Sequence, residues 1–239
     1  MKIYALQNIR HMDTNRKTPA PIQNISYVLI IGLLLLTAIE ALSVITGVWS
    51  LISQAIFSQS TVADTVYAFF AGSQGIIFTF IPIVFAVWLY RMNSNLRQFV
   101  AHKMEFTPGW AVGWYLIPIA NLVLPYRSMR ELWRASHHSW KADPAILRWW
   151  WGLWLFRGIF DGSSNQLFGL ASTAENAIAI TSAYIVADIF NVALNLVALR
   201  IVTSIWAAYE ENYMMLPDKT QDEPNIEIHQ LKESEKQSL

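Results

Sequence analysis

The chain has 239 residues, of which 54% are hydrophobic and only 14% are charged, with 17 basic and 17 acidic side chains. Ordinary soluble domains carry about 25% charged residues, so the composition argues against a soluble globular protein and for a membrane protein. Because the formal net charge is zero, the chain has no overall electrostatic attraction to nucleic acid. The absence of cysteine excludes disulfides, iron–sulfur clusters, thiolate zinc sites and cysteine nucleophiles.

Residues 1–24 form a basic polar segment, and the apolar run 25–46 that follows contains a single charged residue, Glu40. At the rise of an α-helix the run covers roughly 33 Å, which exceeds a hydrocarbon core of about 30 Å. It therefore predicts an uncleaved membrane-spanning helix.

The run 68–90 predicts a second span, since it contains no charged residue. Pro82 should kink this helix because proline removes one helix hydrogen bond. Trp88 and Tyr90 close the run and are expected as anchors at the membrane interface.

The third apolar run, 110–124, is too short to span, since it covers only about 22 Å at helical rise. It follows Pro108, contains Pro118 and stops at Pro125. It is expected to enter the membrane and return, or to lie at the interface.

Two further spans are predicted at 146–165 and 177–199. The first is the weaker candidate because it contains Arg157 and Asp161. The second has Asp188 at its centre.

The distribution of basic residues predicts the topology. Lys and Arg number four in 1–24, none in 51–67, three in 91–109, five in 125–148 and none in 166–176. Basic loops stay cytoplasmic, so four spans with both ends in the cytoplasm satisfy the rule. The expected fold is an all-α polytopic helical membrane bundle over 25–208, with a disordered acidic cytoplasmic tail at 209–239.

One stretch reads FTPGWAVGWYLIPIANL over 106–122 and PYRSMRELWRA over 125–135, and WWGLWL follows at 150–155. It resembles the bacterial membrane family known as domain of unknown function 4328. Val123 and Leu124 depart from a pattern that often has Trp-Lys there. The flanking helices agree in order and hydropathy over 25–208, and the resemblance implies a protein of the bacterial cytoplasmic membrane with no known activity. The matching family-motif residues are Pro108, Gly109, Trp110, Gly113, Trp114, Pro118, Asn121, Pro125, Tyr126, Arg130, Glu131 and Trp133.

The family motif has two interpretations. It is either a re-entrant loop in which Asn121 and Tyr126 offer hydrogen bonds to a ligand, or a platform at the membrane surface anchored by Trp110, Trp114 and Tyr115. The second is favoured.

Polar residues inside the predicted spans form the other candidate site. Its members are Glu40, Arg157, Asp161, Asp188, Asn191 and Asn195. Asp188, Asn191 and Asn195 share one helix face, and charges at membrane depth should be paired or face water. The cluster is either an interhelical polar clamp or a proton relay or ligand site. Asp188 is the favoured partner of Arg157, with Asp161 and Glu40 as alternatives.

No catalytic, cofactor or metal motif is found, and the adjacent pair His137 and His138 has poor geometry for a shared metal ion. The favoured function is a non-enzymatic interaction or structural component of the membrane. Its expected partners are the lipid bilayer, anionic lipid at the cytoplasmic basic loops, and a second copy or another membrane protein, with no nucleic acid. The alternative is a small oligomeric proton-linked transporter or channel using Asp188 and Arg157.

Overall fold

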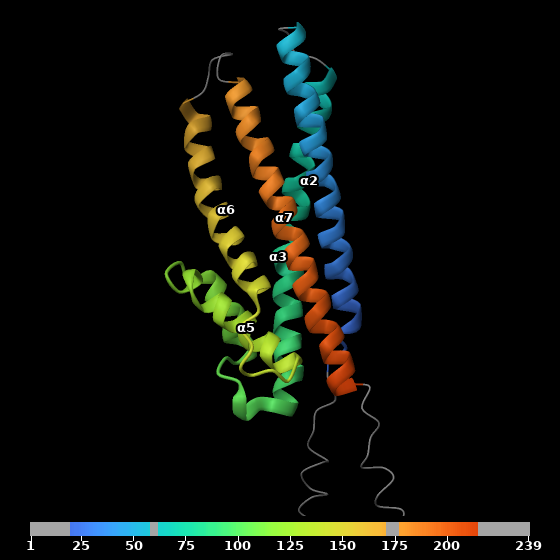
Figure 1. Ribbon diagram of the computed structural model, residues 1–239, viewed down its shortest axis with the longest axis vertical. Coiled ribbons are helices and arrows are strands. Elements are labelled where there is room, and N and C mark those ends of the chain that lie inside the picture. The colour runs from blue at the N-terminus through green and yellow to red at the C-terminus, as the bar shows by residue number, and fades with distance from the viewer. Residues whose placement is uncertain (1–19, 58–61, 171–176, 215–239) are drawn as a thin grey trace, which may run out of the picture.

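The computed structural model describes residues 20–57, 62–170 and 177–214, without the side chains at 57, 76–78, 159–170, 177 and 214. Every regular element in these ranges is helical, which confirms the predicted all-α class. The four long helices are α2 (Gln23–Phe57), α3 (Val62–Val100), α6 (Ala145–Leu170) and α7 (Ala177–Tyr209). α2 packs against both α3 and α7, and α6 packs mainly against α7 (Figure 1).

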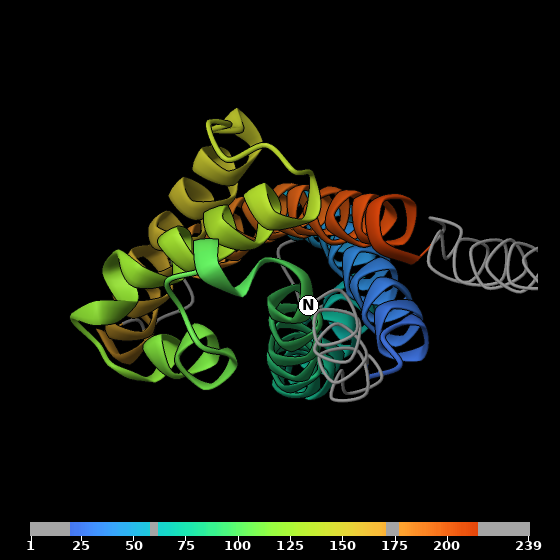
Figure 2. The ribbon, with the colours of Figure 1, turned by 90° about the horizontal axis from the view of Figure 1, so that it is seen from below.

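The segment 101–144, called the platform below, gathers at one end of the bundle. It holds η1 (Ala101–Lys103), α4 (Pro108–Gly113), η2 (Trp114–Leu116), η3 (Ala120–Leu122) and α5 (Leu124–Ser136). This is the end at which α2 begins and at which α3 and α7 finish (Figure 1). Seen from this end, α5 lies across the bundle (Figure 2). The start of α2 and the ends of α3 and α7, which are far apart in sequence, therefore lie beside the platform (Figure 1).

Among the residues that the structure describes, three helical stretches are long and apolar enough to cross a membrane: Gln23–Ile56, Val62–Lys103 and Ile178–Tyr213. Their large apolar side chains point outward to an unusual extent. Ile31, Leu35 and Ile45 of α2, for example, are 55%, 55% and 64% exposed. Soluble proteins rarely expose such continuous apolar surface, whereas lipid-facing helices do.

By length and apolarity alone, three of the four predicted spans qualify as membrane-crossing helices. The helix α6 matches the predicted fourth span in place and has 26 residues. It carries Arg148, Arg157 and Asp161, which make it less apolar than the other three. We therefore treat its crossing as a proposal below.

The face of α2 that packs against α3 carries small residues. Trp88 of α3 is fully buried, and its indole nitrogen donates a 3.0 Å hydrogen bond to Ser26 Oγ. Further along, Gln54 Nε2 donates to Asp64 Oδ1 at 2.7 Å. The Trp88 ring therefore faces protein and not lipid headgroups, unlike the interfacial anchor expected from the sequence, whereas Tyr90 is 50% exposed.

The packing of α2 against α7 is antiparallel and fixed by a close approach at Gly47. A Cβ there would lie 2.8 Å from Ile185 Cγ1, so a larger residue would push the helices apart. At the other end the rings of Tyr27 and Trp206 meet edge to face, with centroids 5.0 Å apart. This register sets which polar residues of the two helices meet.

Several helices extend beyond the apolar runs that predict them. α2 continues to Phe57, and α3 begins at Val62 and continues to Val100 with Pro82 inside it. At the C-terminal end, α7 is followed by a short π-helix, η5 (Glu210–Met214). The predicted tail 209–239 therefore starts too early, because helical hydrogen bonding carries on to Met214. The rest of that tail lies outside the described residues.

The run 110–124 forms no continuous helix. It is divided among α4, η2 and η3, none longer than six residues. Pro118 lies between η2 and η3 and lacks the N–H that a continuous helix would need. Leu116 and Ile119 on either side are 83% and 85% exposed.

Candidate functional site

The helix α5 is the amphipathic centre of the platform. Its first turn contains Pro125, where a missing N–H costs no helix hydrogen bond. Its buried side consists of Pro125, Ser128, Met129, Leu132, Ala135 and Ser136. Arg127, Arg130 and Arg134 are spaced by three and four residues and share the other side. The sequence thus presents three guanidinium groups along one helix face.

Two charged side chains hold the turn that precedes α4. From one side, Arg97 Nη1 donates to the carbonyls of Met104 at 3.2 Å and Phe106 at 3.0 Å. From the other, the Glu131 carboxylate accepts from the backbone N–H groups of Glu105 at 2.7 Å and Phe106 at 3.2 Å. Burial raises the pKa of Glu131, and the two N–H donors oppose this effect. The carboxylate thereby connects α5 to the end of α3.

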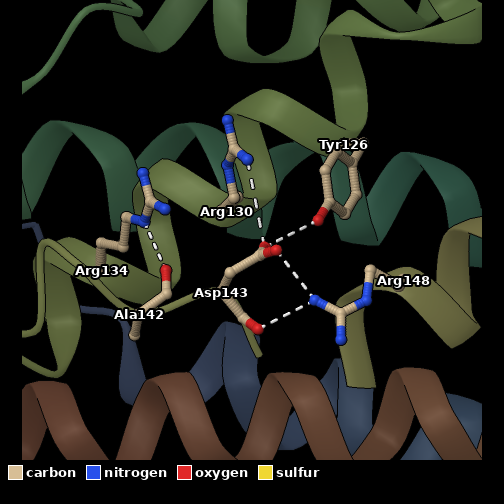
Figure 3. Close-up of polar contacts among 6 residues, drawn as sticks. All are labelled: Tyr126, Arg130, Arg134, Ala142, Asp143 and Arg148. Atoms are coloured by element: carbon tan, nitrogen blue, oxygen red, sulfur yellow. Dashed lines mark hydrogen bonds and ion pairs between the residues drawn. The ribbon is translucent and has the colours of Figure 1, made fainter. Parts of the chain in front are cut away.

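Asp143 connects the start of α5 to the start of α6 (Figure 3). Tyr126 Oη donates to its Oδ1 at 2.9 Å, and Arg148 Nη1 donates to its Oδ2 at 2.8 Å. Arg130 Nη1 lies 4.0 Å from Oδ1. The bond from Tyr126, followed by the arginines, lowers the pKa of Asp143, so this carboxyl is ionised at neutral pH. The family-motif residues Tyr126 and Arg130 thus hold the α5–α6 connection.

A pocket of about 170 Å³ lies between the turn after α3 and the basic face of α5. It is lined by Lys103, Glu105, Phe106, Arg127, Arg130, Glu131, Arg134 and Trp140. Four of these side chains are basic and two are acidic, so positive charge predominates. An anion is the ligand that this lining suits.

The motif aromatics build the exposed part of the platform. Trp110 and Trp114 stack with centroids 4.5 Å apart, and Trp110 is 52% exposed. A Cβ on Gly113 would lie 3.4 Å from the Trp110 ring, so glycine leaves room for this ring. Tyr115 is held inward, where its ring meets Phe85 edge to face with centroids 6.1 Å apart. Burial raises the pKa of Tyr115.

The other motif residues have local roles. Pro108 begins α4, and Gly109 lies within that helix with open space where a Cβ would be. Asn121 donates its backbone N–H to the Ile117 carbonyl at 2.7 Å, which closes the turn containing Pro118. Trp133 stacks on His137, with centroids 4.3 Å apart. His137 also contacts Ser204 of α7 at 3.1 Å, and burial lowers the pKa of this histidine.

Four members of the predicted polar cluster, Glu40, Arg157, Asp188 and Asn195, interact with one another inside the bundle. Asn195 Nδ2 donates to Glu40 Oε2 at 2.6 Å, and Ser43 Oγ donates to Asp188 Oδ2 at 2.6 Å. Glu40 is 1% exposed and Asp188 is 7% exposed. Asn191 is also buried, and its Oδ1 has no hydrogen-bond donor among the described residues. The antiparallel register of α2 and α7 produces both pairs.

Arg157 of α6 interacts electrostatically with both buried carboxyl groups. Each carboxyl group also has a hydrogen-bond donor, Asn195 for Glu40 and Ser43 for Asp188. The side chain of Asp161, the sixth predicted member, lies outside the described residues.

The sequence interpretation missed four residues that the structure places at these sites: Ser43, Arg97, Asp143 and Arg148. Ser43 stands one helical turn after Glu40, where a hydroxyl would share its face. Asp143 precedes Pro144 and the start of α6, a position at which acidic residues often stabilise a helix N-terminus. These local signals were available in the sequence. Nothing in the sequence near Arg97 indicates its two carbonyl partners.

In the comparison with protein families, the model of the family described as domain of unknown function (DUF4328) matches residues 53–207. This range covers α3, the platform and α6 completely and most of α7. The match confirms the resemblance drawn from the motif residues. No curated protein and no solved structure matches the chain.

Proposed function

Because the chain belongs to the domain of unknown function 4328 family, whose description assigns no activity, we propose that it is a non-enzymatic membrane component acting through interactions at its platform. It crosses the bacterial cytoplasmic membrane four times, with α2, α3, α6 and α7 as the spans. Both termini and the platform are on the cytoplasmic side. Its partners are anionic lipid and a second copy of the chain or another membrane protein.

The observation that carries this proposal is the arrangement of apolar and basic side chains on the platform. Leu116 and Ile119 are more than four-fifths exposed, which favours lipid rather than water as their surroundings. Val123 is also exposed, and Arg127 follows it by one helical turn. The basic face of α5 therefore begins where the apolar segment ends, as expected for a helix at the headgroup level.

The proposed topology predicts which introduced cysteines a membrane-impermeant thiol reagent can label. The native chain has no cysteine, so single replacements give no background. Gln59→Cys and Thr173→Cys, in the connections without basic residues, should be labelled in intact cells with a permeable outer barrier. Lys141→Cys, exposed on the platform, should be labelled only after the cytoplasmic membrane is opened.

A detergent-opened sample of each variant controls for the reactivity of the thiol itself. Labelling of Lys141→Cys in intact cells would place the platform outside and overturn the proposal. With the N-terminus in the cytoplasm, the same result would mean that the chain crosses the membrane an odd number of times before α5.

The buried carboxyl groups support a second candidate, a small oligomeric proton-linked transporter or channel. Glu40 and Asp188 lie at membrane depth in this topology, beside Arg157 of α6, and such groups often mark proton pathways. In that case proteoliposomes containing the chain would dissipate an imposed pH gradient. Asp188→Asn would abolish this flux, whereas Asp143→Asn on the platform would not. A wild-type chain that leaves the gradient intact would count against the second candidate.

A further inference from the structure

We infer that the pocket between the turn after α3 and α5 binds the phosphate group of one anionic lipid headgroup. This inference rests on the proposed function, because it requires the platform to lie at the membrane surface. It goes further in assigning a single phosphate to defined residues. A general attraction between basic loops and anionic lipid requires no such site.

The distribution of ion pairs leaves two cations of the pocket uncompensated. Arg127 pairs with Glu105 at 3.1 Å, and both oxygens of Glu131 are occupied by backbone N–H groups. Among the described residues, by contrast, neither Lys103 nor Arg134 has a carboxylate within 4.0 Å. A phosphate group between these two side chains would supply the missing negative charge and several acceptor oxygens.

The neighbouring side chains hold these two cations in place. Arg134 Nε donates to the Ala142 carbonyl at 2.6 Å, which fixes the guanidinium while its terminal nitrogens extend beyond the contact (Figure 3). The Lys103 ammonium lies 5.5 Å from the centre of the Trp140 ring. A site with one fixed guanidinium and one ammonium over an aromatic ring is partly organised before any anion arrives.

The surroundings of the pocket favour a lipid over a free phosphate. The wall formed by α5 directly follows the exposed apolar residues Leu122 and Val123, each 55% exposed. Arg127 at the near end of the pocket follows Val123 by about one helical turn and Arg134 by about three, but α5 lies across the bundle, so much of this length runs along the membrane surface (Figure 2). If Leu122 and Val123 enter the hydrocarbon layer, the pocket therefore lies near the level of lipid phosphates. Trp140 is an aromatic residue of the kind that gathers at this level.

The test measures lipid binding by the full chain in a neutral detergent, with native mass spectrometry to count bound molecules. Dioleoyl phosphatidic acid, dioleoyl phosphatidylcholine and water-soluble glycerol phosphate are titrated separately. We expect one tightly bound phosphatidic acid per chain and much weaker binding of the other two. Lys103→Gln should weaken phosphatidic acid binding about fivefold, the loss of one basic residue at the surface.

Lys141→Gln is the matched control, because it removes the same charge from an exposed position on the platform outside the pocket. It should leave phosphatidic acid binding unchanged. Equal weakening by both variants would overturn the pocket and leave only the general attraction of the proposed function. Glycerol phosphate binding as tightly as the lipid would overturn the lipid assignment. Equal binding of phosphatidic acid and phosphatidylcholine would contradict both the pocket and the proposed attraction to anionic lipid.

Discussion

Glu131→Ala is expected to lower the free energy of unfolding by about 2 kcal/mol, since it removes a charged acceptor from two backbone N–H groups. The Phe106 residue that carries one of these groups is only 7% exposed, so water replaces the lost bond poorly there. For a chain of this size the loss corresponds to a decrease in melting temperature of about 4–8 °C. Thermal unfolding of the purified protein in detergent measures it.

The same substitution should also release the turn after α3 from α5. Trypsin cleaves after Lys103, so limited digestion of the Glu131→Ala variant should cut there faster than in the wild type. Glu131→Gln keeps one acceptor oxygen and should fall between the two in both measurements.

Glu105→Gln is the matched control, because it changes an acidic side chain of the same turn. The Glu105 carboxylate is 64% exposed and pairs with Arg127 on the surface. Its removal should cost less than about 1 kcal/mol. An equal loss of stability in the Glu105 and Glu131 variants would show that the backbone contacts of Glu131 do not hold the turn.

Hydropathy and proline placement in the sequence were sufficient to predict the helical class and the interruption near Pro118. Both depend on local properties, namely the apolarity of a run and the missing N–H of proline. The ends of α2 and α3 were predicted less well. Gly47 to Phe57 and Arg91 to Val100 are less apolar than the runs before them, yet backbone hydrogen bonding continues the helices through both.

The polar contacts at both sites could be predicted only in part. Helical spacing places Asp188 and Asn195 on one face of α7. Their partners are Ser43 and Glu40 because of the register of α2 against α7. This register is set by the close packing of Gly47 against Ile185. Such a register follows from contacts between residues more than a hundred positions apart. The register of two helices cannot be predicted from the periodicity of one of them.

The sequence and the structure lead to different expectations for the acidic partner of Arg157. The sequence favours Asp188, because both residues stand in neighbouring predicted spans. In the structure Glu40 is the central residue of α2 and is only 1% exposed, and Arg157 interacts electrostatically with both Glu40 and Asp188. Arginine stays charged at any accessible pH, so at membrane depth it needs an anion or water.

Because Glu40 is the more deeply buried of the two carboxyl groups near Arg157, we expect Glu40→Gln to cost about 3–5 kcal/mol of stability, as the removal of one partner of a buried charge pair does. The substitution keeps an oxygen that can accept from Asn195, so the hydrogen bond at 2.6 Å is not the part being removed. Combining Glu40→Gln with Arg157→Gln should recover much of the loss. Thermal unfolding of the two single variants and the double variant in detergent gives the coupling energy between the two residues.

The equivalent cycle with Asp188→Asn should give a smaller coupling energy, since Asp188 is more exposed than Glu40 and its interaction with Arg157 is better screened. Arg148→Gln is the control on the same helix, and its coupling to Glu40 should be close to zero because Arg148 pairs with Asp143 on the platform. A larger coupling for Asp188 than for Glu40 would restore the pairing expected from the sequence. Coupling to neither would identify Asp161, one helical turn further along α6, as the counterion of Arg157.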